Sequence, residues 1–142
     1  MAEDVLEKCF DARLVARRPA GVTANLRLVG ASDVDTLGTP LSAAPGLHLY
    51  GSEGAEVAAL PGGRRHLGGG LTVAMVRFAA RYEYARTVED VLARRFRLLF
   101  LDAAQAAGLA AEVGELLRQE TGVDPQAAAF RELAASYLQM PS

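Results

Sequence analysis

The sequence of 142 residues has two histidines, His48 and His66, and one cysteine, Cys9, as its candidate imidazole and thiol groups for metal binding or nucleophilic chemistry. A metal site needs three or four His, Cys, Asp or Glu ligands that converge on one point. No such spacing occurs around either histidine, so both are predicted to be surface or loop residues. Cys9 has no histidine near it and falls on an apolar stripe, which favours a small buried hydrophobic residue over a nucleophile.

A glycine-rich loop at residues 61–70 carries two adjacent arginines, Arg64 and Arg65. Backbone N–H groups and guanidinium groups together bind phosphate well. However, the loop follows no predicted strand, and it lacks both the P-loop pattern and the glycine pattern of a dinucleotide-binding turn. We therefore predict a flexible connector here, the most mobile part of the chain, rather than a phosphate site.

The other candidate residues gather around one helix junction: Glu83, Glu89, Asp90, Arg94, Arg95 and Arg97. Catalysis by paired carboxylates needs two carboxylates that face each other across a cleft. Acids this close in sequence are more typical of helix caps and ion pairs. The aliphatic stems of Arg95 and Arg97 are predicted to cover apolar surface. An anion-binding role for Arg94 and Arg95 is the alternative. No catalytic, cofactor-binding or metal-binding residue is predicted in the chain.

The segment that holds these charges begins with a helix-start signal. Thr87 and Asp90 have the spacing of a capping box, with aspartate in place of the usual glutamate or glutamine. Arg86 and Arg94 each lie four residues from Asp90, a spacing at which opposite charges stabilise a helix. The apolar residues expected on the buried side of this helix are Val88, Val91, Leu92, Leu98 and Leu99.

Three more helices are predicted around it. Residues 71–85 have apolar positions on two faces, which indicates the central helix of a bundle. Asp102 is an N-cap residue and Gly122 a C-cap residue for the next helix. Asp124 and Pro125 have the pattern of an N-cap followed by proline at the first helical position. The residues that the last helix is expected to bury are Phe130, Leu133, Ala134, Tyr137 and Leu138.

The predicted fold class is therefore all-α: a helical bundle with a loosely structured, glycine-rich N-terminal half. Residues 2–14 are predicted to form an amphipathic helix, residues 23–29 an extended connector, and residues 53–60 a short helix capped by Ser52. A single domain is expected over residues 1–142. Its helix and connectors lie in residues 1–70, and its bundle core lies in residues 71–142.

The composition narrows the function classes. A formal net charge of −2 argues against a nucleic-acid partner, which needs a basic face. No apolar run reaches the roughly 18–20 residues of a membrane span. With one cysteine and no basic-then-apolar leader, the chain is expected in the cytoplasm.

Five segments carry a resemblance to a known family. Ala79–Arg95 matches the family pattern almost throughout, and Leu98–Ala103 continues it. Asn25–Ala31 is similar to a Leu-x-Leu-x-Gly passage, His48–Ser52 to a Tyr-Gly turn, and Met1–Asp4 to the point where the chain leaves a preceding domain. The family that these segments resemble is the C-terminal helical domain of FAD-dependent, aerobic-type glycerol-3-phosphate dehydrogenases.

The sequence departs from this family in several places. The region Pro61–Gly70 is short and glycine-rich where the family has a proline-rich approach to its central helix. Met75 and Phe96 stand where the family usually has Glu and Thr.

The resemblance implies a cap domain of a larger flavoenzyme. That enzyme would oxidise sn-glycerol 3-phosphate to dihydroxyacetone phosphate and pass electrons through FAD to a membrane quinone. The flavin- and substrate-binding residues would precede Met1, so these 142 residues are expected to bind no FAD and to be inactive alone. The expected partner is the FAD and substrate domain of the same polypeptide. A homodimer and peripheral association of the intact enzyme with the inner face of the cell membrane are further expectations.

Two alternatives belong to other function classes. One is a stand-alone helical adaptor or regulatory interaction module that shares ancestry with the domain. The other is a helix-turn-helix DNA binder at residues 84–100, which the acidic balance disfavours.

Overall fold

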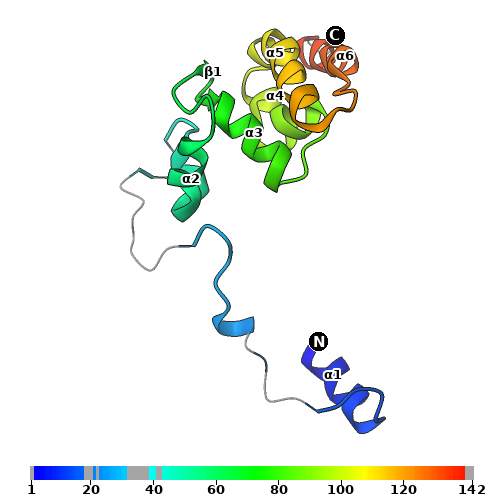
Figure 1. The fold of residues 1–142 in the computed structure, drawn as a ribbon. Helices are drawn as coiled ribbons and strands as arrows, with labels where there is room; N and C mark the ends of the chain where they lie inside the picture. The colour runs from blue at the N-terminus through cyan, green and yellow to red at the C-terminus, as the bar shows by residue number, and fades with distance from the viewer. Residues whose placement is uncertain (1, 18–20, 22, 32–38, 41–42, 140–142) are drawn as a thin grey trace.

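The computed structural model describes residues 2–17, 21, 23–31, 39–40 and 43–139, and its architecture is mostly helical (Figure 1). The α-helices are α1 (Ala2–Asp11), α2 (Gly54–Ala59), α3 (Val73–Tyr82), α4 (Leu98–Leu101), α5 (Ala103–Thr121) and α6 (Ala127–Leu138). The 3₁₀-helices are η1 (Thr23–Asn25) and η2 (Leu47–Glu53), and the π-helix is η3 (Asp90–Arg95). In the described part of the chain, β-structure is limited to one antiparallel hairpin of β1 (His66–Gly68) and β2 (Leu71–Thr72). The all-α prediction is confirmed.

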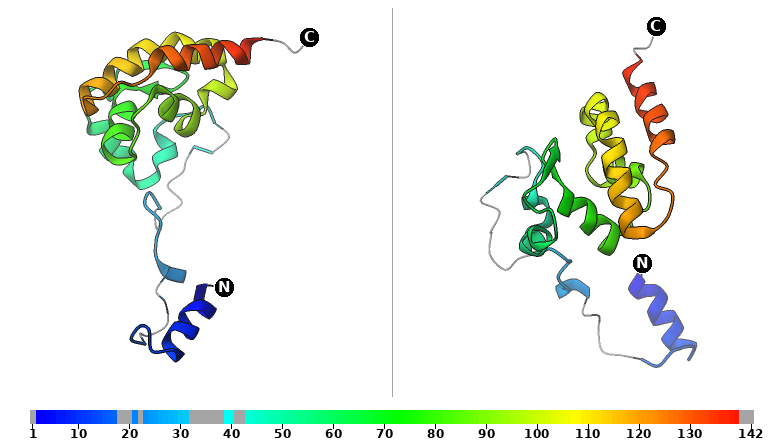
Figure 2. Two further views of the ribbon diagram at one scale, coloured as in Figure 1. Left: turned by 90° about the vertical axis from the view of Figure 1, so that its right-hand side faces the viewer. Right: turned by 45° about the horizontal axis from the view of Figure 1, so that its top comes forward.

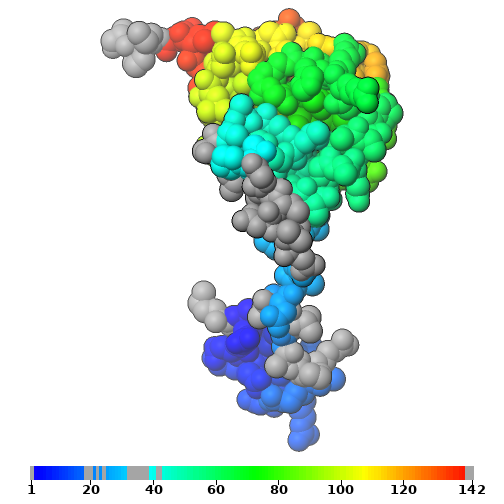
Figure 3. Space-filling view, turned by 90° about the vertical axis from the view of Figure 1, so that its left-hand side faces the viewer, coloured from blue at the N-terminus to red at the C-terminus, as the bar shows by residue number. Residues whose placement is uncertain are grey.

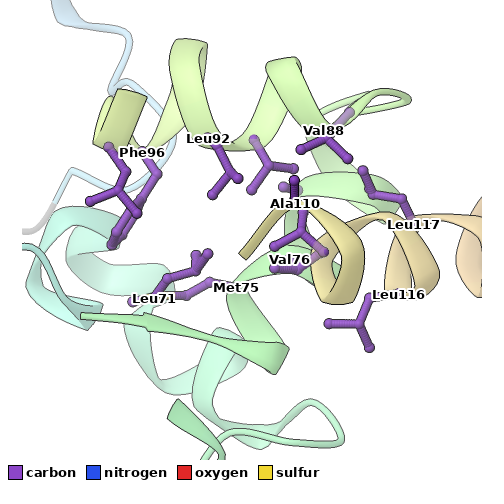
Figure 4. Close-up of a cluster of buried hydrophobic side chains, with 14 of the residues drawn as sticks. Leu71, Met75, Val76, Val88, Leu92, Phe96, Ala110, Leu116 and Leu117 are labelled. Carbon is purple, nitrogen blue, oxygen red and sulfur yellow. The ribbon is translucent and has the colours of Figure 1, made fainter. Parts of the chain in front are cut away.

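The hydrophobic core forms where α3, η3 and α5 meet. Figure 4 shows side chains from these three elements pointing into one interior, among them Val76, Leu92 and Leu117, each 0% exposed. Figure 2 shows α6 running side by side with α5, where it buries Phe130 and Ala134. Val57 of α2 is also fully buried in this core. No helix in the described part of the chain has the length and apolar character needed to cross a bilayer.

Helix α3 is the central helix that the sequence predicts, although it is shorter than residues 71–85. Thr72 is its N-cap, since the Met75 N–H donates to Thr72 Oγ1 at 3.3 Å. Met75 occupies the third helical position, where a capping box has glutamate or glutamine, and its Sδ accepts from the Thr72 N–H at 3.4 Å. The helix ends at Tyr82, which is 67% exposed rather than buried, and Tyr84 then adopts a left-handed backbone.

The capping box at Thr87 and Asp90 is confirmed in both directions. The Thr87 N–H donates to Asp90 Oδ2 at 2.9 Å, and the Asp90 N–H donates to Thr87 Oγ1 at 3.1 Å. The five predicted core residues of this segment are all buried. They do not share one α-helix, however, because the chain first widens into the π-helix η3. Arg97 then turns left-handed with φ 59°, so that α4 begins separately.

The caps of α5 form as predicted, whereas α6 begins later than its sequence signal. Asp102 accepts the Gln105 N–H at 2.9 Å, and Gly122 closes α5 in a left-handed conformation. Pro125 is not the first residue of α6, because its carbonyl accepts the Val88 N–H at 2.9 Å and Gln126 is left-handed. Tyr137 and Leu138 were predicted to be buried, but they are 51% and 54% exposed.

The N-terminal helix is separate from the helical body. Helix α1 ends at Asp11 rather than residue 14, it buries none of its residues, and Figure 3 shows it beyond the connector. In the predicted connector at residues 23–29, the short helix η1 forms at Thr23–Asn25. The division at residue 70 stays a prediction, and residues 32–38 and 41–42 of its first part lie outside the described residues.

Two predictions for residues 52–70 are wrong. Ser52 does not cap α2, whose N-cap is Glu53; the Ser52 hydroxyl lies 3.5 Å from the Ala31 carbonyl instead. Residues 61–70 form turns and β1, which pairs with β2 in a hairpin, where the sequence predicts a flexible connector. The hairpin packs against α5, and the Val73 N–H donates to the Arg65 carbonyl at 3.0 Å.

Candidate functional site

An open pocket of about 460 Å³ lies beside the C-terminal end of α3. We call it the acidic pocket, and its lining residues are Val29, Gly30, His48, Leu49, Tyr50, Gly51, Glu53 and Glu83. They come from the connector, from η2 and from the residue that follows α3. The pocket therefore joins segments that are far apart in the sequence.

A close backbone contact builds one wall of the acidic pocket. The Ser52 N–H donates to the Gly30 carbonyl at 2.9 Å, which holds the connector against η2. Gly51 has φ 54° and ψ −127°, and a Cβ at this position would lie 2.1 Å from the Gly30 carbonyl oxygen. Only glycine satisfies both conditions, because an L-residue would be strained there and would also clash.

Tyr50 forms the apolar side of the pocket. Its ring stands edge-on to the ring of Phe78 with centroids 5.3 Å apart, which ties η2 to α3. Burial raises the pKa of the Tyr50 hydroxyl, and the nearby Glu83 carboxylate raises it further, against the opposing effect of Arg95. The hydroxyl is therefore neutral at physiological pH.

The polar side of the pocket is dominated by two carboxylates. Partial burial raises the pKa of Glu83, Arg95 lowers it, and the charge of Glu53 raises it again. Arg95 Nε lies 3.5 Å from Glu83 Oε2, and the same guanidinium also donates to the backbone carbonyls of Glu83 and Asp90. Within the part of the chain that the structure describes, no cation pairs with Glu53. The pocket therefore carries more negative than positive charge.

His48 contributes a polar atom without a partner. Its Nε2 is buried and makes no hydrogen bond within the described residues. Such atoms are rare in folded proteins, because an unmade buried hydrogen bond costs about 1–3 kcal/mol. The sequence predicts a surface or loop histidine; His48 lies in η2 and is partly buried, and its Nε2 is covered.

Asp90 organises the neighbouring junction as a structural residue. Partial burial raises the pKa of Asp90. Hydrogen bonds from the N–H groups of Arg86 and Thr87 and from the side chains of Thr87 and Arg94 lower it by more, so the pKa of Asp90 is about 2. The predicted Asp90–Arg94 pair forms at 2.6 Å, and Arg94 also reaches Glu89 at 2.8 Å. The predicted Arg86–Asp90 side-chain pair does not form. The Arg86 guanidinium instead donates to the carbonyls of Ala80 and Ala85, at 2.9 and 3.0 Å.

A second ion-pair cluster joins α3 to α5. Glu120, 12% exposed, accepts two bonds from Arg81 at 2.6 and 3.0 Å, and its carboxylate also lies 3.3 Å from Arg77 Nε. The Arg77 contact is electrostatic only, because its angle does not make a hydrogen bond. The bonds from Arg81 are the main reason that the pKa of Glu120 is lowered, against the effect of burial.

The remaining residues singled out in the sequence do not converge. Arg64 and His66 are exposed, and Arg65 pairs with Glu112 on α5 rather than forming a phosphate cradle. Cys9 is predicted to be buried, but it is only partly covered, and no residue of α1 is buried. Among the described residues, no group of three His, Cys, Asp or Glu side chains is placed to hold a metal ion.

The sequence analysis mentions most segments that line the acidic pocket, but it does not predict that they meet. Asn25–Ala31, His48–Ser52 and Glu83 each lie in a segment that carries the family resemblance. Tyr50 and Glu53 had no pattern that marked them as site residues, since nothing in their spacing predicts that η2 folds onto the connector.

Comparison with known proteins places the chain in a family. Residues 21–128 match the family described as the C-terminal domain of alpha-glycerophosphate oxidase. This chain belongs to that family. Over 53 residues, 37% of the chain, it is 49% identical to the mitochondrial glycerol-3-phosphate dehydrogenase of Schizosaccharomyces pombe. The aligned part spans only 8% of that relative. No solved structure matches the chain.

Proposed function

We propose that this alpha-glycerophosphate oxidase-type C-terminal domain is the non-catalytic helical cap of an FAD-dependent glycerol-3-phosphate dehydrogenase. The family match over residues 21–128 carries the proposal, and the similarity to a glycerol-3-phosphate dehydrogenase supports it. The intact enzyme oxidises sn-glycerol 3-phosphate to dihydroxyacetone phosphate and passes the electrons through FAD to a quinone. In this scheme the 142 residues supply a packing surface rather than reacting groups.

The described residues do not fit a flavin site. A dinucleotide is held where a glycine-rich turn joins a strand of a parallel sheet to a helix. The β-structure described here is one short antiparallel hairpin, which offers no such turn. We therefore assign the FAD and the substrate to the rest of the intact polypeptide, and we expect neither flavin binding nor turnover from these 142 residues alone.

The exposed apolar residues of the N-terminal segment support packing against a larger body. Large apolar side chains that stay in solvent mark interaction surfaces when they gather in one segment. Those of residues 5–29 are Val5, Leu6, Leu14, Val15, Leu26, Leu28 and Val29, all at least 49% exposed. The FAD and substrate domain of the same polypeptide is the partner that we propose for them.

The proposal extends to the setting of the intact enzyme. Reduction of a membrane quinone requires the enzyme to reach the bilayer, so we propose peripheral association with the inner face of the cell membrane from the cytoplasm. A homodimer is part of the same proposal, and sedimentation of the intact enzyme tests it.

An immunoblot of the source-cell extract, with antibody raised against this chain, tests the main proposal. We expect one band several times larger than the 15.0 kDa of the chain, in a membrane fraction that contains flavin. A band at 15.0 kDa alone would contradict the proposal and would favour the stand-alone adaptor.

A second test uses the purified 142-residue chain. We expect a colourless protein that reduces no dye in the presence of glycerol 3-phosphate. A yellow protein that turns over this substrate would show that the chain holds its own flavin site.

A further inference from the structure

We propose that the acidic pocket is a binding site for a guanidinium or alkylammonium group. The inference rests on the pocket itself, and it holds whether or not the domain belongs to a flavoenzyme. It assigns a ligand class to a place where three separate segments of the chain converge.

The charges of the pocket select a cation. Glu53 and Glu83 are both lining residues. Burial is the main cause of the raised pKa of Glu83, and the charge of Glu53 adds to it against the effect of Arg95. Among the described residues, the cation that pairs with these carboxylates is Arg95, which lies 3.5 Å from Glu83 and is not a lining residue. A positively charged ligand beside Glu53 would supply the missing partner and would relieve the repulsion between the two carboxylates.

The other lining groups select an organic cation rather than a bare metal ion. The side chains of Leu49 and Tyr50 offer apolar surface to the carbon stem of an amine or guanidine, and the ring of Tyr50 can lie against its charged face. No described group of His, Cys, Asp and Glu side chains in the chain is arranged to hold a metal ion. A volume of about 460 Å³ is ample for the tip of an arginine or lysine side chain.

The guanidinium or alkylammonium group can come from two sources. One is a basic side chain from another segment of the intact polypeptide, and the other is a free guanidine or amine metabolite. Both donate several N–H groups to carboxylates, so the isolated chain binds a small guanidinium in either case.

The two histidines allow a direct test by NMR. His48 lines the pocket, whereas His66 is exposed on β1 and serves as an internal reference in the same spectrum. A His66→Gln variant assigns the two Cε1–H resonances. Titration with methylguanidinium chloride at constant ionic strength is expected to shift the His48 resonance saturably and to leave that of His66 unchanged.

Two matched controls separate binding from general charge effects. Methylurea has a similar planar shape without the charge, and we expect no shift with it. Glu53→Gln is expected to weaken methylguanidinium binding about tenfold, because one charge-assisted contact is lost. Glu56→Gln removes the same charge from the exposed face of α2 outside the pocket lining, and we expect it to bind as tightly as the wild type.

Three results would overturn the proposal: no saturable shift of His48, an equal response to methylurea, or equal weakening by Glu56→Gln and Glu53→Gln. If the isolated chain binds, the intact polypeptide identifies the source. Loss of methylguanidinium binding there means that a basic side chain of the protein already fills the pocket. Retained binding means that the pocket accepts a free ligand. Neither measurement depends on flavin or turnover, so this proposal and the proposed function can fail separately.

Discussion

At the scale of single residues, the Asp90 carboxylate takes the place of backbone carbonyls as the acceptor for two N–H groups. It accepts the N–H groups of Arg86 and Thr87 at 3.0 and 2.9 Å, which the turn before η3 leaves without backbone partners. Its neighbour Glu89 is 40% exposed, and its partner among the described residues is the Arg94 side chain. The two acids are adjacent in the sequence, yet only Asp90 is built into the fold.

Replacing Asp90 with Asn should therefore destabilise the chain, by about 1–2 kcal/mol, because the amide can accept less and carries no charge. Glu89→Gln is the matched control, and its cost should stay below about 0.5 kcal/mol because that pair is exposed. Urea unfolding at pH 7 measures both. Equal costs for the two variants would show that Asp90 is no more than a surface ion-pair residue.

The same residue predicts a pH dependence. The pKa of Asp90 is about 2 in the folded chain, against an ordinary value of 3.8. Because the folded pKa is lowered, the stabilisation is fully present above the unfolded value and is lost as the pH falls through the folded value. The stability difference between wild type and Asp90→Asn should be constant near neutrality and should shrink between about pH 4 and pH 2. Urea midpoints across this range test it, and a difference independent of pH would contradict it.

At the scale of the elements, sequence patterns correctly predicted the features that depend on residues close together in the chain. The two-faced apolar pattern of α3, the capping box at Thr87 and the caps of α5 at Asp102 and Gly122 all formed, since each depends on neighbours within a few residues. The start of α6 did not follow its Asp124-Pro125 signal. The Pro125 carbonyl is bonded instead to Val88, a residue far away in the sequence. Tertiary contacts of this kind leave no local pattern.

Glu120 holds α3 and α5 together, and this contact was also beyond sequence reasoning. Glu120→Gln should lower the free energy of unfolding by about 1 kcal/mol or more. It removes the negative charge that pairs with Arg81 and Arg77, and the Glu120 side chain is mostly buried. Glu115→Gln is the control, since its pair with Arg118 is more than half exposed and should contribute little. Thermal unfolding compares them. Similar melting temperatures for both variants would show that the α3–α5 contact depends on its apolar side chains alone.

The wall of the acidic pocket depends on Gly51, and Gly122 serves as a control for the effect of its positive φ alone. Gly51→Ala combines a disallowed backbone with a clash against the Gly30 carbonyl, whereas a Cβ at Gly122, also at positive φ, meets nothing within 4 Å. We expect Gly122→Ala to cost about 1 kcal/mol and Gly51→Ala clearly more, with loss of methylguanidinium binding only in the latter. Equal costs with binding retained would mean that the connector does not need its close approach to η2.

At the scale of the whole molecule, the acidic pocket shows where sequence reasoning stops. All its lining residues except Glu53 lie in segments that carry the family resemblance, but the resemblance does not predict which of them meet in space. Their convergence comes from Tyr50 packing on Phe78 and from the Ser52–Gly30 hydrogen bond, both of which are long-range contacts. A buried His48 Nε2 without a partner can likewise be recognised only once its surroundings are known.

The N-terminal helix gives the clearest prediction at this scale. Its side chains pair with neighbours in the sequence: Lys8 lies 3.5 Å from Asp4, and Arg17 bonds Glu7 and Asp11 and lies 5.2 Å above the ring of Phe10. Since α1 buries no residue, deletion of residues 1–17 should move the melting temperature by no more than about 2 °C. Leu92→Ala, in the same assay, should cost about 2–5 kcal/mol because it opens a cavity in the core.

A loss of stability on deletion comparable to that of Leu92→Ala would mean that α1 packs on the body of its own domain. Its apolar side chains would then be unavailable to another part of a larger polypeptide. An unchanged melting temperature leaves Val5, Leu6 and Leu14 as exposed apolar surface that contributes nothing to this domain. In that case the same deletion, made in the intact flavoenzyme, should destabilise the contact between cap and body, and limited proteolysis should then release the cap faster than from the undeleted enzyme.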